Sequence, residues 1–236
     1  MADDTQPRMP LTRERILRAA LRLADADGLE VLSMRRIARE LGVQAMSLYN
    51  HVANKEEIVD GIVDTVVGEI GVPRTDGDWL EAMRSRARSA HEVLVRHRWA
   101  TMALVSRITV GPAMLRYVDA SIGCLHRAGF SYELADHALN ALDNHIYGFT
   151  LQELHFPFEV PEYADQAREF LDRVPLDDYP YFGKLARLVV DGSYSGVNDF
   201  DFGLELILDG LDRMRGDRPK RGGNHEGDSQ HEVGTT

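Results

Sequence analysis

The sequence contains a single cysteine, Cys124, among 236 residues. One cysteine excludes an internal disulfide and fits a reducing compartment, and we interpret it as a small core residue on a helix. No apolar run approaches the roughly 20 residues needed to span a bilayer. Residues 1–10 also lack the apolar segment of a signal peptide. We therefore expect a soluble, cytoplasmic protein that does not contact a membrane.

Catalytic and metal-binding motifs are missing as well. The nine histidines are scattered, and the chain has no His-Glu-x-x-His sequence and no paired cysteines. A Gly-x-Ser-x-Gly elbow and a glycine loop for phosphate are also absent. These absences argue against an enzyme, and we expect neither a cofactor nor a metal.

The net charge of -11 argues against a general nucleic-acid binder, but the charge is unevenly distributed. Residues 1–52 hold eight arginines against seven acidic groups, so the remainder of the chain holds nearly all the excess acid. An acidic body repels DNA and favours docking through the basic end. The alternative is that the acidic surface serves only solubility.

Local signals in residues 33–61 indicate two short helices around a turn and a third helix after them. Ser33 is a typical N-cap, apolar residues follow at helical spacing, and Gly42 supplies the left-handed stop. The helix restarts over residues 45–51, with Val43 and Leu48 directed inward. Asn54 and Glu57 then form a capping box that begins a helix carrying Lys55 on its first turn.

This stretch resembles the DNA-binding domain of the tetracycline-repressor (TetR) family. The resemblance rests on Leu-Gly-Val at 41–43, Leu-Tyr-x-His-Val at 48–52 and Asn-Lys-Glu at 54–56. Upstream, residues 11–29 are similar to the first helix of that family, with Thr12 as its cap and Gly28 as its stop. The resemblance implies a helix-turn-helix domain over 11–70 that includes a connecting fourth helix.

The resemblance also implies DNA contacts. Positions where relatives touch phosphates or bases are occupied by Ser33, Arg35, Ser47, Tyr49, His51 and Lys55, and the recognition helix also presents Ala45, Met46 and Asn50. The founding repressor has Gln, Pro and Trp at these last three positions, so we expect a different operator sequence here. Arg35 or Asn50 could hydrogen-bond a base edge, whereas Ala45 and Met46 offer only apolar contacts. Alternative interpretations pack Tyr49 partly against the first helix and leave His51 as a polar surface residue.

The pattern beyond residue 71 predicts a second, larger helical domain over 71–215, which makes the whole chain all-α. Gly71-Val72-Pro73 and the polar run after it interrupt the helical spacing. We expect helices at about 78–97, 99–106, 112–128, 132–155, 162–174, 180–191 and 200–215. Residues 1–10 and 216–236 are polar and aperiodic, and we expect flexible ends there.

Two of these helices carry more apolar surface than one core uses. Residues 132–155 have two stripes, one of which includes Ala138, His145 and Gly148. Residues 200–215 have a second face with Gly203, Ile207, Gly210 and Met214. Pairing both helices with their twins gives a four-helix bundle, the homodimer interface that the resemblance also implies. Two recognition helices about 34 to 36 Å apart read a palindromic operator in double-stranded DNA.

The resemblance further implies a small-molecule effector inside the larger domain. From spacing and position we select as lining residues Met83, Arg86, Ala90, Met102, Val105, Ile108, Tyr117, Asn144, Tyr147 and Gln152, with His145 beside them. The alternatives are a core role for Met102, Val105 and Ile108, a surface role for Arg86, and a dimer contact for His145. The founding repressor holds its drug through magnesium, and Val105, Ile108 and Gln152 stand at its ligand positions. Because these side chains are poor magnesium ligands, we expect a neutral or acidic, largely apolar effector, with Arg86 as partner if it is acidic.

These observations predict a ligand-responsive repressor that binds DNA as a homodimer and is released by its effector. Three alternatives stay open. The chain could be an activator or a ligand-independent regulator with the same DNA-binding domain, a ligand-binding module that has lost DNA binding, or an enzyme.

Overall fold

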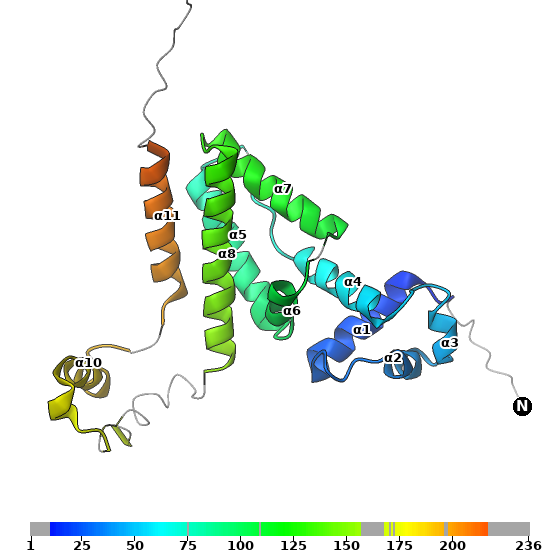
Figure 1. The fold of residues 1–236 in the computed structure, drawn as a ribbon, viewed down its shortest axis with the longest axis horizontal. Helices are drawn as coiled ribbons and strands as arrows, with labels where there is room; N and C mark the ends of the chain where they lie inside the picture. Colours follow the sequence, from blue (N-terminus) through cyan, green and yellow to red (C-terminus); the bar gives the residue numbers. More distant parts are fainter. Residues whose placement is uncertain are drawn as a thin grey trace, which may run out of the picture.

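The computed structural model describes residues 10–74, 76–108, 110–156, 168–169, 171, 173–195 and 198–216. Within these ranges the chain forms helices and no strand, which confirms the all-α expectation (Figure 1). In chain order the elements are α1 (Arg13–Asp27), α2 (Met34–Leu41), α3 (Ala45–Leu48), α4 (Lys55–Val67), α5 (Trp79–Arg96), α6 (Ala100–Ser106), α7 (Pro112–Arg127), α8 (Tyr132–Leu154), the 3-10 helix η2 (Leu176–Asp178), α10 (Pro180–Val190) and α11 (Phe200–Gly216). No helix in this described part is long and apolar enough to cross a membrane.

The helices of the larger domain agree with the sequence pattern to within about a turn at each end. The helix expected over 162–174 falls mostly outside the described residues, and so do nearly all residues of the two expected flexible ends. The short helix η2 was not expected. Cys124 is a buried residue of α7, as expected, and burial raises the pKa of its thiol.

Side-chain caps begin several helices where the sequence placed them. The side chains of Thr12, Ser33 and Asn54 accept hydrogen bonds from the backbone N–H three residues further on. Gly42 ends α2 with a φ of 66°, a left-handed backbone that favours glycine. The capping box differs in one detail, because Glu57 accepts from the N–H of Ala53 rather than from that of Asn54. These local bonds fix where α1, α2 and α4 begin.

The recognition helix is shorter than expected. We expected residues 45–51 to be helical, but α3 spans only Ala45–Leu48, and residues 49–51 form a turn. The N–H of His51 donates to the carbonyl of Leu48 at 2.9 Å, which tightens the backbone after one turn of helix. Leu48 is fully buried and anchors α3 to the helix-turn-helix domain of residues 11–70, called the small domain below.

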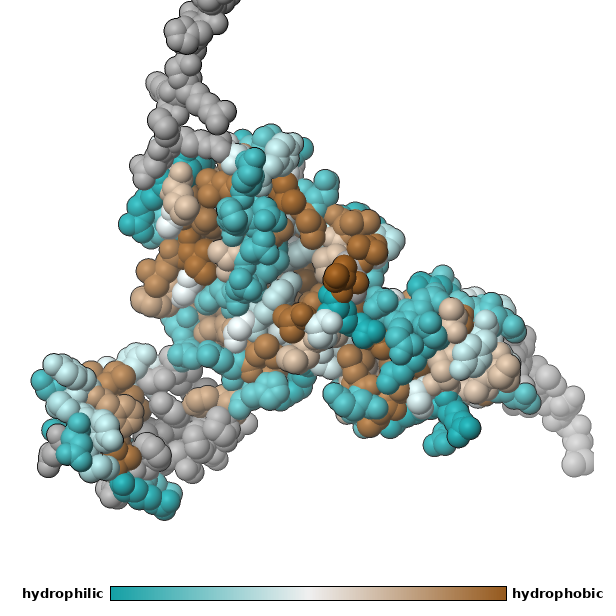
Figure 2. All heavy atoms as spheres, viewed as in Figure 1, coloured by the Kyte–Doolittle hydropathy of each residue, from teal (hydrophilic) through white to brown (hydrophobic). Residues whose placement is uncertain are grey.

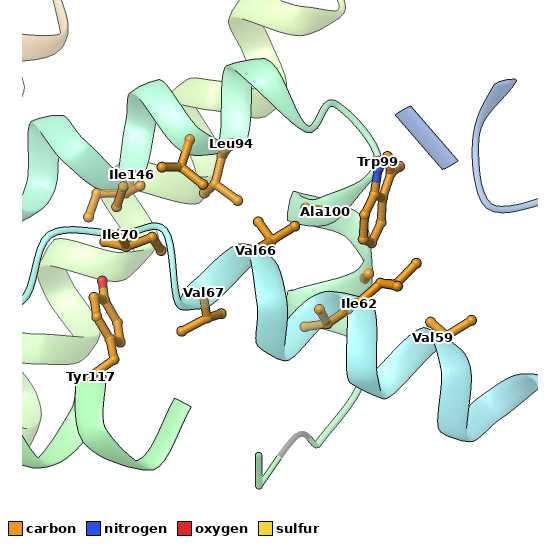
Figure 3. Close-up of a cluster of buried hydrophobic side chains, with 14 of the residues drawn as sticks. Val59, Ile62, Val66, Val67, Ile70, Leu94, Trp99, Ala100, Tyr117 and Ile146 are labelled. Carbon is orange, nitrogen blue, oxygen red and sulfur yellow. The ribbon is translucent and has the colours of Figure 1, made fainter. Parts of the chain in front are cut away.

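Helix α4 belongs to the cores of both domains. Ile58, Ile62, Val63 and Val66 are fully buried, although they lie on more than one face of the helix. Helix α4 packs against α1 on the small domain and against α6 and α7 on the large domain. Figure 3 shows its side chains beside Leu94, Trp99, Ala100 and Tyr117 of the large domain. The expected bridging role of this helix follows from this double burial.

A carboxylate of α4 caps the first turn of α7. The side chain of Asp64 accepts hydrogen bonds from the backbone N–H groups of Ala113, at 3.2 Å, and Met114, at 2.9 Å. The residue before α7 is Gly111, and a Cβ added there would lie only 2.1 Å from Oδ1 of Asp64. Glycine therefore permits the close approach of α4 to this helix end. The small and large domains are thus joined by directional bonds as well as by apolar packing.

Helices α8 and α11 pack against each other within one chain (Figure 1). Nε2 of His145 lies 2.9 Å from the carbonyl oxygen of Phe200. A Cβ at Gly203 would lie 2.4 Å from the His145 ring, so this glycine serves the contact inside the chain. Gly203 and His145, which were expected on the intersubunit stripes, thus contact each other within the chain and are both half-buried. The outward face of α11 instead exposes Phe202, Leu206 and Met214, and Figure 2 shows apolar side chains along that edge.

Replacing Asp64 with alanine tests the cap that joins α4 to α7. We expect Asp64→Ala to lower the free energy of unfolding by about 1 kcal/mol, the usual effect of losing a side-chain cap. Urea unfolding followed by circular dichroism measures the change. Asp119→Ala, at an exposed carboxylate of α7, is the matched control and should leave stability unchanged. Equal unfolding midpoints for the two variants would contradict the capping role.

Candidate functional site

The outer face of α2, α3 and the turn after α3 is polar and open to solvent. Ser33, Arg35, Asn50 and His51 are exposed, and Ala45 and Ser47 are half-buried. Met46 is 73% exposed and Tyr49 is 47% exposed, so neither side chain is a core residue. The alternative in which Tyr49 packs against the first helix therefore applies to only part of the Tyr49 side chain. Beneath this face, Ile37 and Leu48 are fully buried and hold the two helices together.

Arginines on α2 make one end of this face positively charged. Arg36 pairs with Asp27 of α1, whereas Arg35 and Arg39 make no ion pair within the described part of the chain. A hollow of about 730 Å³ is lined by Leu23, Ser33, Arg35, Arg36, Arg39 and Glu40. Unpaired guanidinium groups beside a hydroxyl suit the phosphate oxygens of a nucleic-acid backbone.

Lys55 lies at the edge of this face and is half-buried. Its Nζ donates to the carbonyl oxygen of Leu29, between α1 and α2, at 3.4 Å. The ammonium group is therefore held close to the start of α4 by a contact within the domain. A long, weak hydrogen bond to a neutral carbonyl leaves the other protons of this ammonium group for an anion.

A second site lies inside the large domain, where an arginine is buried between helices. Arg86 of α5 is 1% exposed, and its Nη2 donates to Oδ1 of Asp143 on α8 at 2.5 Å. The guanidinium carbon lies 4.5 Å from the centroid of the Tyr117 ring on α7. The surface alternative for Arg86 was therefore wrong. Three helices thus converge on one buried cation.

The titratable groups around Arg86 are strongly influenced by burial. Burial raises the pKa of Asp143, and Arg86 opposes this effect. Burial also raises the pKa values of Tyr117 and Tyr147 well above the usual range, so both phenols keep their protons. The cluster therefore offers a permanent cation and two neutral hydroxyl groups.

Arg86 is not fully satisfied by its neighbours. Among the residues that the structure describes, its buried Nε and Nη1 atoms have no hydrogen-bond partner, and neither has the hydroxyl of Thr101 on α6. Buried donors without partners are uncommon in folded proteins and are expensive, since each has lost its water. A bound molecule with acceptor oxygens would satisfy them.

Some of the other residues expected to line the effector site are buried, and the rest are exposed. Met83 and Ala90 are buried on α5 together with Arg86, while Tyr147 is half-buried on α8. Met102, Val105 and Ile108 are 54%, 52% and 95% exposed, which contradicts the core alternative for them. Asn144 and Gln152 also face solvent. Helix α6 turns only Ala100, Thr101 and Ala103 fully inward, so its remaining apolar side chains lie outside.

Asp143 was not among the lining residues that the sequence analysis selected. It lies four residues before Tyr147, on the same helix face, and that spacing was the available signal. The positions of the founding repressor's magnesium ligands do not fit that metal here. Val105 and Ile108 supply no donor atom, and the neutral amide of Gln152 is a poor ligand. Within the described residues no cluster of histidine, cysteine and acidic side chains has the arrangement of a metal site.

Comparison with known proteins identifies the family of both domains. The model of the tetracyclin repressor-like C-terminal domain matches residues 72–215, and that of bacterial regulatory proteins of the tetR family matches residues 16–62. The HTH-type transcriptional repressor DrrR1 of Streptomyces coeruleorubidus is 31% identical over 87% of this chain and 79% of its own length. The tetracycline repressor protein class C of Escherichia coli is 30% identical over 87% of this chain and 92% of its own length.

A solved structure shows the same fold with a ligand. The complex of ActR from Streptomyces coelicolor with actinorhodin is 31% identical and has a TM-score of 0.73, covering 89% of this chain and all of that one. The match spans both the small and the large domain. The chain therefore belongs to the TetR family of ligand-responsive transcriptional repressors, with a tetracycline-repressor-like C-terminal domain.

Proposed function

We propose that this protein is a homodimer that binds a palindromic DNA operator through residues 11–70 and leaves it when an effector binds within residues 71–215. The observation that carries the proposal is the open face of α2 and α3, whose unpaired arginines lie beside exposed polar side chains. The relatives named above are repressors, which favours repression over activation. The protein acts by binding and not by catalysis.

The outer face of α2, α3 and the turn after α3, called the reading face below, makes two kinds of contact with DNA. Ser33, Arg35, Ser47, Tyr49, His51 and Lys55 hold phosphates, which set the register of the domain on the duplex. The exposed amide of Asn50 reads a base edge, and Ala45 and Met46 contact a thymine methyl group. Arg35 is long enough to reach either a phosphate or a base.

The homodimer forms through the outward faces of α8 and α11. Leu206 and Phe202 are 58% and 68% exposed one helical turn apart, and this is the surface that pairing with a second copy would cover. A helix as short as α3 reads only a few base pairs. Two copies of α3 related by a two-fold axis, at the spacing of successive major grooves, recognise a palindromic operator.

The effector binds at Arg86, between α5, α7 and α8. Support comes from the two unpaired guanidinium nitrogens and from the protonated phenols beside them, which together favour a molecule with a carboxylate or phenol oxygen. The structure of ActR with actinorhodin supports a small-molecule effector for this fold. Release is a shift of population towards a form whose reading helices no longer match the groove spacing.

Arg35→Ala tests the DNA-reading face. We expect weaker binding to a duplex selected from a random pool. The slope of log K against log salt concentration should also become shallower by about 1.8, which is about 0.9 for one phosphate contact in each of the two protomers. Fluorescence anisotropy at several salt concentrations measures both. Arg116→Ala, at an exposed arginine of α7, is the control. A slope equal to that of the control would remove Arg35 from the phosphate contacts.

Leu206→Glu tests the dimer face. A charge in the centre of an apolar interface should convert the dimer to a monomer and abolish tight binding to the selected duplex. Analytical ultracentrifugation measures the mass of the assembly. Leu115→Glu, at a leucine of α7 that is 57% exposed, places the same charge on another surface. Dimers that persist in the Leu206 variant would place the interface elsewhere.

Arg86→Met tests the effector site. The probes are actinorhodin and a panel of aromatic carboxylic acids, titrated into the complex of protein and selected duplex. We expect the probe that releases the wild-type protein to need at least about tenfold higher concentration with Arg86→Met, because a hydrogen bond to a charged group is lost. Arg86→Lys keeps the charge and should lie between the two. Unchanged release by Arg86→Met, with unchanged DNA affinity, would exclude Arg86 as the anchor.

A further inference from the structure

A buried histidine lies where the two domains meet. His97 ends α5 and is 4% exposed. Its Nδ1 lies 2.7 Å from Oδ1 of Asp25 on α1, and its Nε2 lies 3.3 Å from Oε2 of Glu69, just after α4. The two ring nitrogens thus contact two carboxylates, one on α1 and one in the segment that follows α4. This cluster of Asp25, His97 and Glu69 is called the junction triad below.

Two further side chains of the large domain reinforce the junction triad. Nε1 of Trp99 donates to the same oxygen of Asp25 at 2.8 Å, and Nη1 of Arg96 donates to the same oxygen of Glu69 at 2.6 Å. Figure 3 shows the indole of Trp99 facing the part of α4 that carries Ile62. Every donor of the cluster comes from residues 96–99 of the large domain, whereas the acceptors lie on α1 and just after α4.

The two ring nitrogens of histidine suit this position between two carboxylates. A carboxylate only accepts hydrogen bonds, so both contacts form together when both ring nitrogens carry protons. The ring then bridges two anions with two donors that point in fixed, diverging directions. Both N–H donors of a glutamine amide sit on one nitrogen, and its other polar atom is an acceptor oxygen, so it cannot place donors on two separate atoms of a rigid ring. The contacts therefore constrain the orientation of α1 relative to α4 and α5, and not merely their distance.

We propose that His97 is a positioning residue for operator recognition: through Asp25 and Glu69 it holds the reading domain at the angle in which α3 meets the DNA groove. Helix α2 packs on α1, and α3 packs on α2, so the orientation of α1 sets that of the reading face. This role rests on the proposed DNA binding. His97 thus affects the affinity for the operator although it lies outside both the reading face and the Arg86 cluster.

Two readouts on His97→Gln test the proposal. The first is affinity for the duplex that the wild-type chain selects from a random pool, which should fall about tenfold, within the usual range for coupling between sites. The second is the distance distribution between spin labels at Arg18→Cys on α1 and Asp119→Cys on α7, in a Cys124→Ser background. Labelled chains are diluted with unlabelled chains so that only pairs within one chain count. This distribution should be narrow in the wild type and broad in the variant.

Controls separate positioning from stability. His155→Gln makes the same change at an exposed histidine whose ring hydrogen-bonds to the carbonyl oxygen of Leu151, and both readouts should stay at wild-type values. Asp25→Asn, on the partly exposed side of the junction triad, should reproduce the effects of His97→Gln with less risk to folding. Circular dichroism confirms that each variant is folded.

The outcomes distinguish the proposal from the function on which it rests. Lower affinity with an unchanged distance distribution would overturn the positioning role, and so would a broad distribution with unchanged affinity. If the wild-type chain selected no duplex, the proposed function would fail. The distance measurement would then still show whether the junction triad fixes the angle between α1 and the large domain.

Discussion

The structure depends on one helix that fills two cores. Val59, Ile62 and Val66 of α4 are buried against α1 on one side and against the large domain on the other. Packed interiors resist small displacements, because a gap of a fraction of an ångström already loses much of the contact energy. Helix α4 therefore cannot tilt without repacking both sides. Such an interface favours discrete arrangements over continuous bending, which is the behaviour that a switch between two DNA affinities requires.

Polar contacts give this apolar junction its direction. Hydrogen bonds add a preferred angle to this close packing, because each bond weakens when its donor and acceptor move out of line. The carboxylates of Asp60 and Asp64 on α4 meet Arg107 and the first turn of α7, and Glu69 meets His97 and Arg96. Acidic side chains from the small domain and α4 thus face donors of the large domain along the boundary. Part of the acid of the chain therefore serves contacts between helices.

Sequence reasoning succeeded where the cause was local. The caps at Ser33 and Asn54 and the turn at Gly42 depend on neighbours within a few residues, so their signals lie in short motifs. It failed where partners are distant: 57 residues separate Arg86 from Asp143, and 72 separate Asp25 from His97. No spacing rule connects such pairs. Apolar character alone also misled, since Ile108 is apolar and yet 95% exposed.

Helix α7 brings the proposed effector site close to the junction. Tyr117, which lies under Arg86, is five residues from Pro112 at the capped end of α7, or about 7.5 Å along a helix. A ligand that changes the packing of Tyr117 acts on the same rigid element whose first turn is bonded to Asp64 of α4. The coupling is reciprocal by thermodynamic necessity. DNA that fixes α1 and α4 must lower the affinity for an effector by the factor by which that effector lowers the affinity for DNA.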